Sequence, residues 1–481
     1  MDVNLKNWCN TAEEIGVQLT DEYFKMQVGL KYDQKRIANL EGENAKHSEE
    51  FLKSWKEPKE LFNSCVESVA SAKTHELLLK LHEDRKKKIT SSKHKFADQP
   101  VNWNTWRQFV TVADDKSRKE VFDEFMKKTP LISPLIKKRF DFFCEINKKY
   151  GTNPLDSYLF EHKMNLSNLK EFLTTLQDGT RSAFKKKFSL YTNKFFKREP
   201  TYYDDFYFMR NVIYSGMDEG FKHVNSLEQI KKTFLSMNLD PSKIHVDDVD
   251  RPDKYPSPFA QFVKIPSDIR ISYKIENPLN TARSIYHEMG HAIHASNIDA
   301  NLPYWTKYLL SNGLAETFSI FFEDLLSDKE YLTKVLKLNS DYADDFIKRT
   351  TFAEAFSIAL YTANSFFKIK YWSEDLPFEE TNQIYTAELK KAFGFEIPGE
   401  YWQLHHILPE STMYVPSYML AMVNAFNTTN ELRSKLGIQW WKEKKAGKFM
   451  LDIMSPGSES RVSDFSKIDA KEYVKHIVEL L

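Results

Sequence analysis

The sequence predicts a mainly α-helical protein, and three observations carry this prediction. Among its 481 residues, Gly is scarce at 14 and Pro modest at 18, while charged residues make up 28%. This composition is typical of a helix-rich chain and not of an all-β or disordered one. Apolar residues recur with a helical period over most of the chain, interrupted by loops rich in Pro, Gly and Asn. A chain of this length can hold several domains or one large body with lobes.

The balance of charge excludes some classes of partner. The 68 basic and 68 acidic residues cancel, so no overall field attracts the protein to nucleic acid or to an anionic membrane. No apolar run approaches the roughly 20 residues that a membrane-spanning helix needs. The 3 cysteines are far apart and form no Cys-x-x-Cys pair, which fits a reducing compartment. The first residues lack the basic and apolar regions of a secretory signal, and we therefore expect a cytoplasmic protein.

The pattern changes twice along the chain. From residue 1 to about 200 it predicts one helix after another, with no group of residues that has obvious chemistry. A Pro- and Tyr-containing loop near residue 200 indicates a boundary between an N-terminal helical lobe, residues 1–200, and a second lobe, residues 201–481, which holds all the candidate functional residues described below. Between about residues 240 and 280, the short runs "KIHVDDV", "QFVKI" and "IRISYKI" predict a small sheet. Helices then resume and dominate to the C-terminus.

One predicted helix, "TARSIYHEMGHAIHAS" at residues 281–296, carries three histidines and a glutamate on an otherwise apolar surface. Because a helix turns by about 100° per residue, His287 and His291 lie one turn apart on one face, where both can bind a single ion. Glu288 lies beside them, close enough to reach a water held by that ion but badly placed to be a ligand. This is the H-E-x-x-H arrangement, in which zinc acidifies a water and the glutamate takes its proton. We therefore predict a site for one Zn²⁺ ion.

The surroundings of these residues favour a metal over a cluster of satisfied core histidines. The helix is apolar on most sides, so it should be buried, and buried polar side chains need a partner. Asn280 is expected to cap the helix, and Gly290 indicates that another backbone packs closely against it. His294 stays on the same face but two turns away from His287. We expect it beside the ligands or facing the substrate, rather than as a ligand.

A catalytic zinc site usually has three protein ligands and an open position. No histidine follows at a short spacing, so a carboxylate should complete the site, and the candidates are Glu316, Glu323 and Glu354. Glu316 is favoured because it lies on the next helix, which starts at Ser311 or Asn312 and is a natural antiparallel partner of the metal helix. Glu323 then fits an outer position that orients a ligand histidine. Glu354 would need a further helix to intervene.

These two helices resemble a known family. "YHEMGHAIH" followed by "GLAETFSIFFEDL" is similar to the thimet oligopeptidase and oligoendopeptidase F family of zinc peptidases, and the strands that precede the metal helix are similar too. The resemblance is clear from about residue 249 to 425. It implies a mostly helical fold with a deep substrate channel between two lobes. It also implies a zinc-dependent endopeptidase that acts on short peptides, with Glu288 as the general base.

A C-terminal segment offers groups for the oxyanion that develops on a scissile carbonyl. This segment, "YWQLHHILPESTMYVPSYMLAMVNAF" at residues 401–426, contains His405, His406, Tyr414 and Tyr418. The family places a histidine and tyrosines in such a segment, which implies that His406, Tyr414 and Tyr418 bind substrate and stabilise the oxyanion. The glycine-rich loop common before the tyrosines in the thimet branch is missing here, which leaves open which tyrosine acts. The strand "IRISYKI" could also lend a free edge to an extended peptide.

Two other functions are consistent with these motifs. A metallocarboxypeptidase of the Taq carboxypeptidase type would also be helical and carry H-E-x-x-H, but that family shows an H-E-S element near its third ligand that "LAETFS" lacks. A non-catalytic binding protein would have the same helical fold without enzymatic activity, although every residue that the zinc site requires is present. Short peptides are the expected partners, and the sequence does not indicate an oligomeric state.

Overall fold

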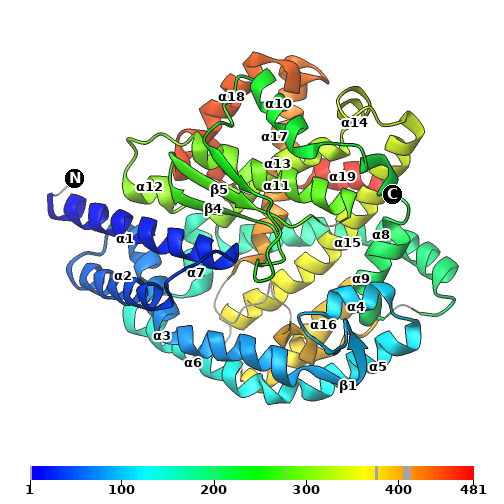
Figure 1. Cartoon of the computed structure of the whole chain (residues 1–481), viewed down its shortest axis with the longest axis horizontal. Helices are drawn as coiled ribbons and strands as arrows, with labels where there is room; N and C mark the ends of the chain where they lie inside the picture. The colour runs from blue at the N-terminus through cyan, green and yellow to red at the C-terminus, as the bar shows by residue number, and fades with distance from the viewer. Residues whose placement is uncertain (1–2, 200, 276, 374–376, 405–412) are drawn as a thin grey trace.

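Helices make up most of the computed structural model, which describes residues 3–481 apart from 200, 276, 374–376 and 405–412. Two small sheets account for the strands of the described residues (Figure 1). The predicted mainly α-helical fold is therefore confirmed. Within the described part of the chain, no helix is long and apolar enough to cross a membrane.

Residues 3–199 form helices around one hairpin. The helices are α1 (Val3–Gln27), α2 (Gln34–Ser54), α3 (Lys59–Lys88), α4 (Trp106–Val112), α5 (Asp115–Lys128), α6 (Ser133–Tyr150), α7 (Pro154–Glu161) and α8 (Leu166–Phe195). The hairpin consists of β1 (Thr90–Phe96) and β2 (Gln99–Asn102), joined by Ala97 and Asp98 at φ 47° and 62°. The sequence predicts only helices here, because the Lys, Ser and His side chains of β1 do not show the apolar signature of a strand.

Among the described residues, the remaining chain holds three strands and eleven α-helices, besides short 3-10 helices and one π-helical turn. The strands are β3 (Ile244–Asp247), β4 (Phe259–Lys264) and β5 (Asp268–Ser272). The helices are α9 (Asp205–Phe208), α10 (Ser226–Ser236), α11 (Pro278–Ser296), α12 (Tyr304–Tyr308), α13 (Asn312–Glu323), α14 (Lys329–Lys334), α15 (Ser340–Ser373), α16 (Thr381–Phe393), α17 (Val415–Leu436), α18 (Lys444–Met454) and α19 (Lys471–Leu480).

The three-stranded sheet has the order β3-β5-β4 and packs against α11 (Figure 1). β3 pairs with β5 in parallel, and β4 pairs with it antiparallel, with Ala260 opposite Ile271. The small sheet expected between residues 240 and 280 is therefore present. The expectation that "IRISYKI" offers a free edge is wrong, because β5 is the central strand and is hydrogen bonded on both sides. The unpaired edge near the metal helix belongs to β4.

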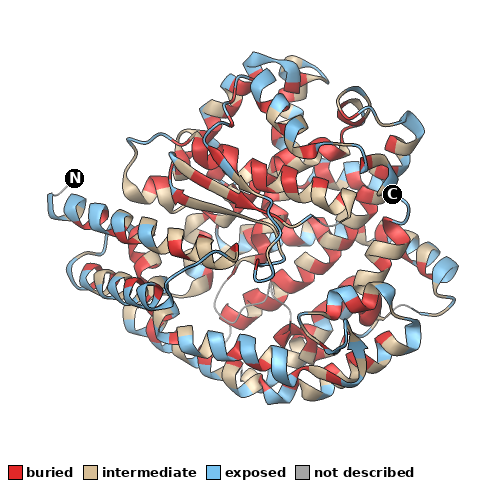
Figure 2. Cartoon of the chain, in the orientation of Figure 1, coloured by how far each residue is buried: buried red, intermediate tan, exposed pale blue. Residues whose placement is uncertain are grey.

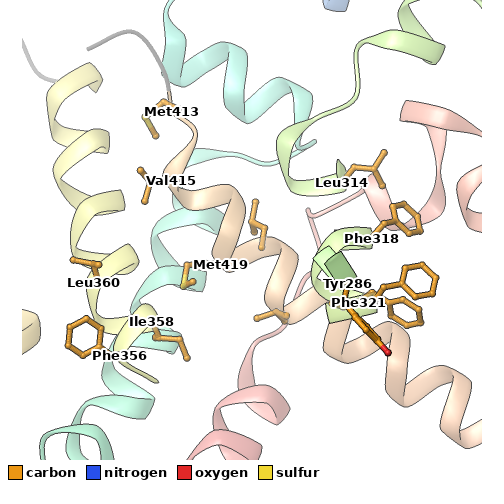
Figure 3. Close-up of a cluster of buried hydrophobic side chains, with 14 of the residues drawn as sticks. Tyr286, Leu314, Phe318, Phe321, Phe356, Ile358, Leu360, Met413, Val415 and Met419 are labelled. Atoms are coloured by element: carbon orange, nitrogen blue, oxygen red, sulfur yellow. The ribbon is translucent and has the colours of Figure 1, made fainter. Parts of the chain in front are cut away.

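A large part of the core lies where α11, α13, α15 and α17 pack together, and these helices are mostly buried in Figure 2. α13 packs along both α11 and α17, and α15 packs along α17. Figure 3 shows the apolar side chains between them, with Tyr286 from α11, Phe318 from α13, Ile358 from α15 and Met419 from α17. Full burial of one such side chain stabilises a fold by roughly 1.5–3 kcal/mol. The helices that carry the candidate ligands are thus fixed by a large core.

Contacts also join the two predicted lobes. α8 packs against α15 and α19, and α1 packs against β4. α15 runs diagonally through the middle of the molecule between the upper and lower helices in Figure 1. The boundary near residue 200 stays a prediction.

Candidate active site

The sequence at the start of α11 fixes where the metal helix begins. The side chain of Asn277 accepts a hydrogen bond from the N–H of Asn280 at 3.0 Å, and Pro278 occupies the first turn, where no N–H is needed. The cap is therefore Asn277, and the expected cap, Asn280, lies one turn inside the helix as the donor. Pro278 explains the difference, because its fixed φ starts the helix before Asn280 is reached.

Gly290 brings α11 and α13 unusually close together. A Cβ atom at this position would lie 2.5 Å from the carbonyl oxygen of Phe318 and 2.7 Å from the Cα of Ser319. The second helix is α13, which begins after Ser311, whose hydroxyl accepts a hydrogen bond from the N–H of Leu314. Because the backbones touch, short side chains on the two helices can reach one another.

Three side chains converge between α11 and α13. The ligand atoms of His287, His291 and Glu316 all lie within 4.8 Å of one another. Nε2 of His287 lies 3.4 Å from Oε2 of Glu316, and Nε2 of His291 lies 3.7 Å from it. Donor atoms around one tetrahedral zinc ion lie about 3.3 Å apart, because each bond measures about 2.0 Å. The type and spacing of these donors therefore fit one Zn²⁺ ion.

A second layer of contacts orients both histidines. Nδ1 of His287 lies 2.9 Å from Oε2 of Glu323, whose other oxygen accepts a hydrogen bond from Nε of Arg283 at 2.8 Å. The ring of His291 hydrogen bonds to the backbone of Ala315. Such partners fix the tautomer of a ligand histidine and raise its basicity. Sequence reasoning missed Arg283, although its position four residues before His287, on the same helical face, was an available signal.

Glu354 lies apart from the histidines. Its carboxylate accepts a hydrogen bond from the hydroxyl of Tyr473 at 3.4 Å, and it belongs to no group of three possible ligands in the described residues. Of the three glutamates named from the sequence, the structure brings Glu316 to the two Nε2 atoms. Glu323 contacts His287 from the other side of its ring.

The charges around the three side chains favour a cation. Burial alone would lower the pKa of His287, but Glu316 and Glu323 hydrogen bond to its ring and raise it well above its ordinary value. Burial would raise the pKa of Glu316, yet the hydrogen bond from His287 and the charge of that ring lower it to about 2. The pKa of His291 is lowered to about 4, chiefly by burial, which keeps that ring in its neutral, ligating form. A divalent ion can replace the positive charge that the proton on His287 supplies.

Glu288 lies beside this group in a protected position. Its residue is 6% exposed, and its carboxylate accepts a hydrogen bond from the backbone N–H of Ala260 on β4. Burial raises its pKa to about 7; the charge of His287 opposes the shift and that of Glu316 adds to it. A carboxylate with a pKa near neutrality is suited to accept a proton and to return it.

His294 does not take part in the group. It is 1% exposed, its ring centroid lies 4.0 Å from that of Phe318, and neither ring nitrogen has a hydrogen-bond partner among the described residues. Burial lowers its pKa to about 3. The expectation that His294 faces the substrate or supports the ligands is therefore wrong. The tight α11–α13 contact encloses it instead.

The tyrosines named from the sequence lie on the other side of Glu316. Tyr414 directly precedes α17, and its hydroxyl donates a hydrogen bond to Oε1 of Glu316. Tyr418 lies one turn further, donates a hydrogen bond to the hydroxyl of Tyr414 and stacks on Tyr361 of α15 with centroids 5.1 Å apart. Sequence reasoning did not single out Tyr361, which carries no motif. His406 lies outside the described residues.

A large cavity adjoins the site. Its volume is about 770 Å³, within the range of roughly 300–1,000 Å³ that is typical of ligand pockets. His287, Glu323 and Tyr418 form part of one wall, and Arg107 and Asp205 form part of another. Side chains from both predicted lobes therefore line the space next to the candidate ligands.

Comparisons with known proteins agree with this architecture. No protein-family model and no curated protein matches the sequence. A structure of PZ peptidase A with an inhibitor matches with a TM-score of 0.63 and 14% identity, covering 95% of this chain and 85% of that one. A structure provisionally named oligoendopeptidase F, from Bacillus anthracis str. Ames, matches with a TM-score of 0.58 and 13% identity, covering 92% and 82%. Another of the same provisional name has a TM-score of 0.62 and 14% identity, covering 92% and 84%.

At 13–14% sequence identity, these matches show a shared fold and no more. It extends over nearly the whole chain, whereas the sequence resemblance is clear only from about residue 249 to 425. The resemblance inferred from the two motif helices is confirmed at this level. The chain has the fold of the PZ peptidase and oligoendopeptidase F structures.

Proposed function

We propose that this chain is a zinc-dependent oligopeptidase that hydrolyses internal bonds of short peptides. The observation that carries the proposal is the convergence of His287, His291 and Glu316 within 4.8 Å, beside the buried carboxylate of Glu288. The fold shared with PZ peptidase and oligoendopeptidase F structures supports peptides as the substrates. The donor set supports zinc, because two imidazoles and a carboxylate with an open fourth position are typical of catalytic zinc.

His287, His291 and Glu316 would hold the ion, which when bound supplies a Lewis acid for the scissile carbonyl and acidifies a water. Glu288 accepts the proton of that water and returns it to the leaving amine. The N–H of Ala260 holds the Glu288 carboxylate at the edge of β4. Arg283 and Glu323 keep the ring of His287 turned towards Glu316.

We assign the oxyanion contact to Tyr414, because its hydroxyl already lies at the carboxylate of Glu316. Tyr418 supports it by donating a hydrogen bond to the Tyr414 hydroxyl. Neutral phenols are required for this role, and burial raises the pKa of both tyrosines above the ordinary value. His406 remains a proposed substrate-binding residue.

An extended peptide substrate is proposed to bind along the free edge of β4. Because the N–H of Ala260 reaches Glu288, a peptide that pairs with this edge would pass beside the general base. Main-chain hydrogen bonds then place the scissile bond with little demand on side chains. A cytoplasmic location belongs to the same proposal, supported by Cys9, Cys65 and Cys144, none of which forms a disulfide.

Exchange of Glu288 for Gln tests the mechanism. The amide cannot accept the proton, so cleavage of an internally quenched peptide should fall by roughly 10²–10⁴-fold while elemental analysis finds unchanged zinc. Glu472→Gln, at an exposed position of α19, is the matched control and should keep full activity. Full peptidase activity in zinc-loaded Glu288→Gln would show the mechanism to be wrong.

The choice of peptide separates the alternative functions. A peptide blocked at both ends should still be cut at an internal bond, and mass spectrometry of the products would locate it. Cleavage that requires a free C-terminus would instead indicate a metallocarboxypeptidase. Protein that binds no zinc and cleaves no peptide would support the helical binding protein.

A further inference from the structure

Tyr361 of α15 lies next to the two tyrosines of the proposed site. α15 packs along α17, and Figure 3 shows the two helices side by side. The ring of Tyr361 stacks on that of Tyr418, with centroids 5.1 Å apart and planes inclined by 19°. Tyr418 in turn contacts the ring of Tyr414 edge-on, with centroids 5.2 Å apart, and donates a hydrogen bond to its hydroxyl. Because the hydroxyl of Tyr414 reaches Glu316, the three rings form a continuous series from α15 to a candidate ligand.

Open space beside Tyr418 makes the contact with Tyr361 important. Both side chains line the cavity of about 770 Å³. A side chain that borders a cavity lacks packing atoms on that side, so fewer contacts oppose its rotation. Among the described residues, the aromatic rings that contact Tyr418 are those of Tyr361 and Tyr414. Without the ring of Tyr361, the ring of Tyr418 could turn into the cavity and release the hydroxyl of Tyr414.

The contact with Tyr418 is made by the ring of Tyr361 and not by its hydroxyl. That hydroxyl makes no hydrogen bond with any residue that the structure describes. A stacked pair of rings is favoured by an amount that corresponds to roughly 2–10-fold in an equilibrium constant. Phenylalanine at this position would preserve the stack, whereas an aliphatic side chain would not. The ring and the hydroxyl can therefore be tested separately.

We propose that Tyr361 is a positioning residue for peptide hydrolysis, which holds Tyr418 and, through it, the hydroxyl of Tyr414 in place for the oxyanion. Tyr361 acts through its ring on Tyr418 and not on the substrate. This inference rests on the proposed oligopeptidase function and adds to it a residue from a third helix, α15, which carries neither the candidate ligands nor the oxyanion donor.

Steady-state kinetics of Tyr361→Leu and Tyr361→Phe with one quenched peptide test the inference. Tyr361→Leu should lower kcat by roughly 3–10-fold with little change in KM, because Tyr414 acts mainly in the transition state. Tyr361→Phe should keep both constants. Phe366→Leu, also in α15, is the matched control and should keep kcat, because its ring faces Nζ of Lys391 at 5.3 Å. Zinc content and urea unfolding are measured for each variant, and Tyr361→Met replaces Tyr361→Leu if the latter does not fold.

A double variant distinguishes positioning from a general loss of structure. In Tyr418→Phe the hydrogen bond to Tyr414 is already absent, so adding Tyr361→Leu should lower kcat little further. A phosphinic peptide, whose tetrahedral oxyanion imitates the transition state, gives a readout without turnover. Its affinity should fall in Tyr361→Leu by about the same factor as kcat/KM and stay unchanged in Tyr361→Phe.

The outcomes separate this inference from the proposed function. Unchanged kcat in Tyr361→Leu, equal losses in Tyr361→Leu and Tyr361→Phe, or losses that multiply in the double variant would each overturn the positioning role. Cleavage of the peptide by the unaltered enzyme would still uphold the proposed function in these cases. Absence of cleavage by the zinc-loaded unaltered enzyme overturns both.

Discussion

Two tyrosines one helical turn apart have different neighbours, and this difference predicts different roles. Tyr414 contacts Glu316, whereas Tyr418 contacts Tyr414 and Tyr361. Tyr414→Phe should therefore lower kcat by roughly 10²-fold with little change in KM, because an oxyanion donor acts mainly in the transition state. Tyr418→Phe should lower kcat by a smaller factor. Steady-state kinetics with one quenched peptide decides, and a larger loss in Tyr418→Phe would reverse the assignment.

How far the site could be predicted depends on how local each contact is. His287, Glu288 and His291 follow from helical geometry alone. Glu316 follows from the next long helix, α13, although the short helix α12, which the sequence did not indicate, comes between α11 and α13. The contact of Tyr414 with Glu316 could not be predicted by spacing, because it depends on how α17 packs against α13. The burial of His294 likewise depends on that packing of neighbouring helices, here α11 on α13.

At the scale of elements, the contact at Gly290 should control the distance between α11 and α13. In Gly290→Ala the new methyl group meets backbone atoms at 2.5 and 2.7 Å, which cannot move aside as a flexible side chain does. We expect a loss of about 1–3 kcal/mol in the free energy of unfolding, together with weaker zinc binding. Gly16→Ala in α1 is the control, since nothing lies within 4 Å of its Cβ position. It should be neutral or stabilising, and equal unfolding midpoints in urea for the two variants would contradict the argument.

The start of α13 depends on a histidine from distant sequence. Nε2 of His162 accepts a hydrogen bond from the N–H of Gly313 at 3.1 Å, and Nδ1 lies 2.8 Å from the carbonyl oxygen of Tyr158. Burial lowers the pKa of His162 to about 4, below the value of about 6.5 in an unfolded chain. The folded state therefore binds fewer protons. The stability that this histidine contributes is complete above about pH 6.5 and is lost as the pH falls through about 4.

His162→Gln measures this contribution. The amide oxygen of Gln can accept the Gly313 hydrogen bond but does not titrate. Between about pH 6.5 and 4, the variant should lose about 3 kcal/mol less stability than the unaltered protein. The other buried histidines titrate in both proteins and cancel in the comparison. Identical pH dependence of urea unfolding in the two proteins would rule out this role for His162.

The three-stranded sheet shows which features of the elements could be predicted from the sequence and which could not. The β-branched runs between residues 240 and 280 indicate strands, and strands are found there. Their order could not be inferred, because β3 joins β5 in parallel from a position before β4 in the chain. Because β3 and β4 both pair with β5, the segment "IRISYKI" has no unpaired edge, and β4 has one instead. The hairpin of β1 and β2 was missed because its strands are polar.

At the scale of the whole molecule, the ion would tie α11 to α13 and so stabilise the fold. At a free zinc concentration about 100 times the dissociation constant, binding adds about 2.7 kcal/mol to the free energy of unfolding. Removal of zinc by a chelator should therefore lower the thermal unfolding midpoint, and added zinc should restore it. Glu316→Gln should respond weakly to both treatments. A midpoint in the unaltered protein that is insensitive to chelator and zinc would contradict the assigned ligands.

The touching backbones of α11 and α13 also determine which changes of chain length the site can tolerate. The relative position of the two helices is set by their own surfaces, not by the segment from Asn297 to Leu310 that joins them. Residues added at the exposed turn around Asn301 would leave the three ligands in register. One residue added inside α11, between His287 and Gly290, would rotate the two histidines apart by about 100°. Insertions in related proteins should therefore accumulate in the connecting segment, so that the number of residues between the two motifs is a poor guide to whether a chain can hold the ion.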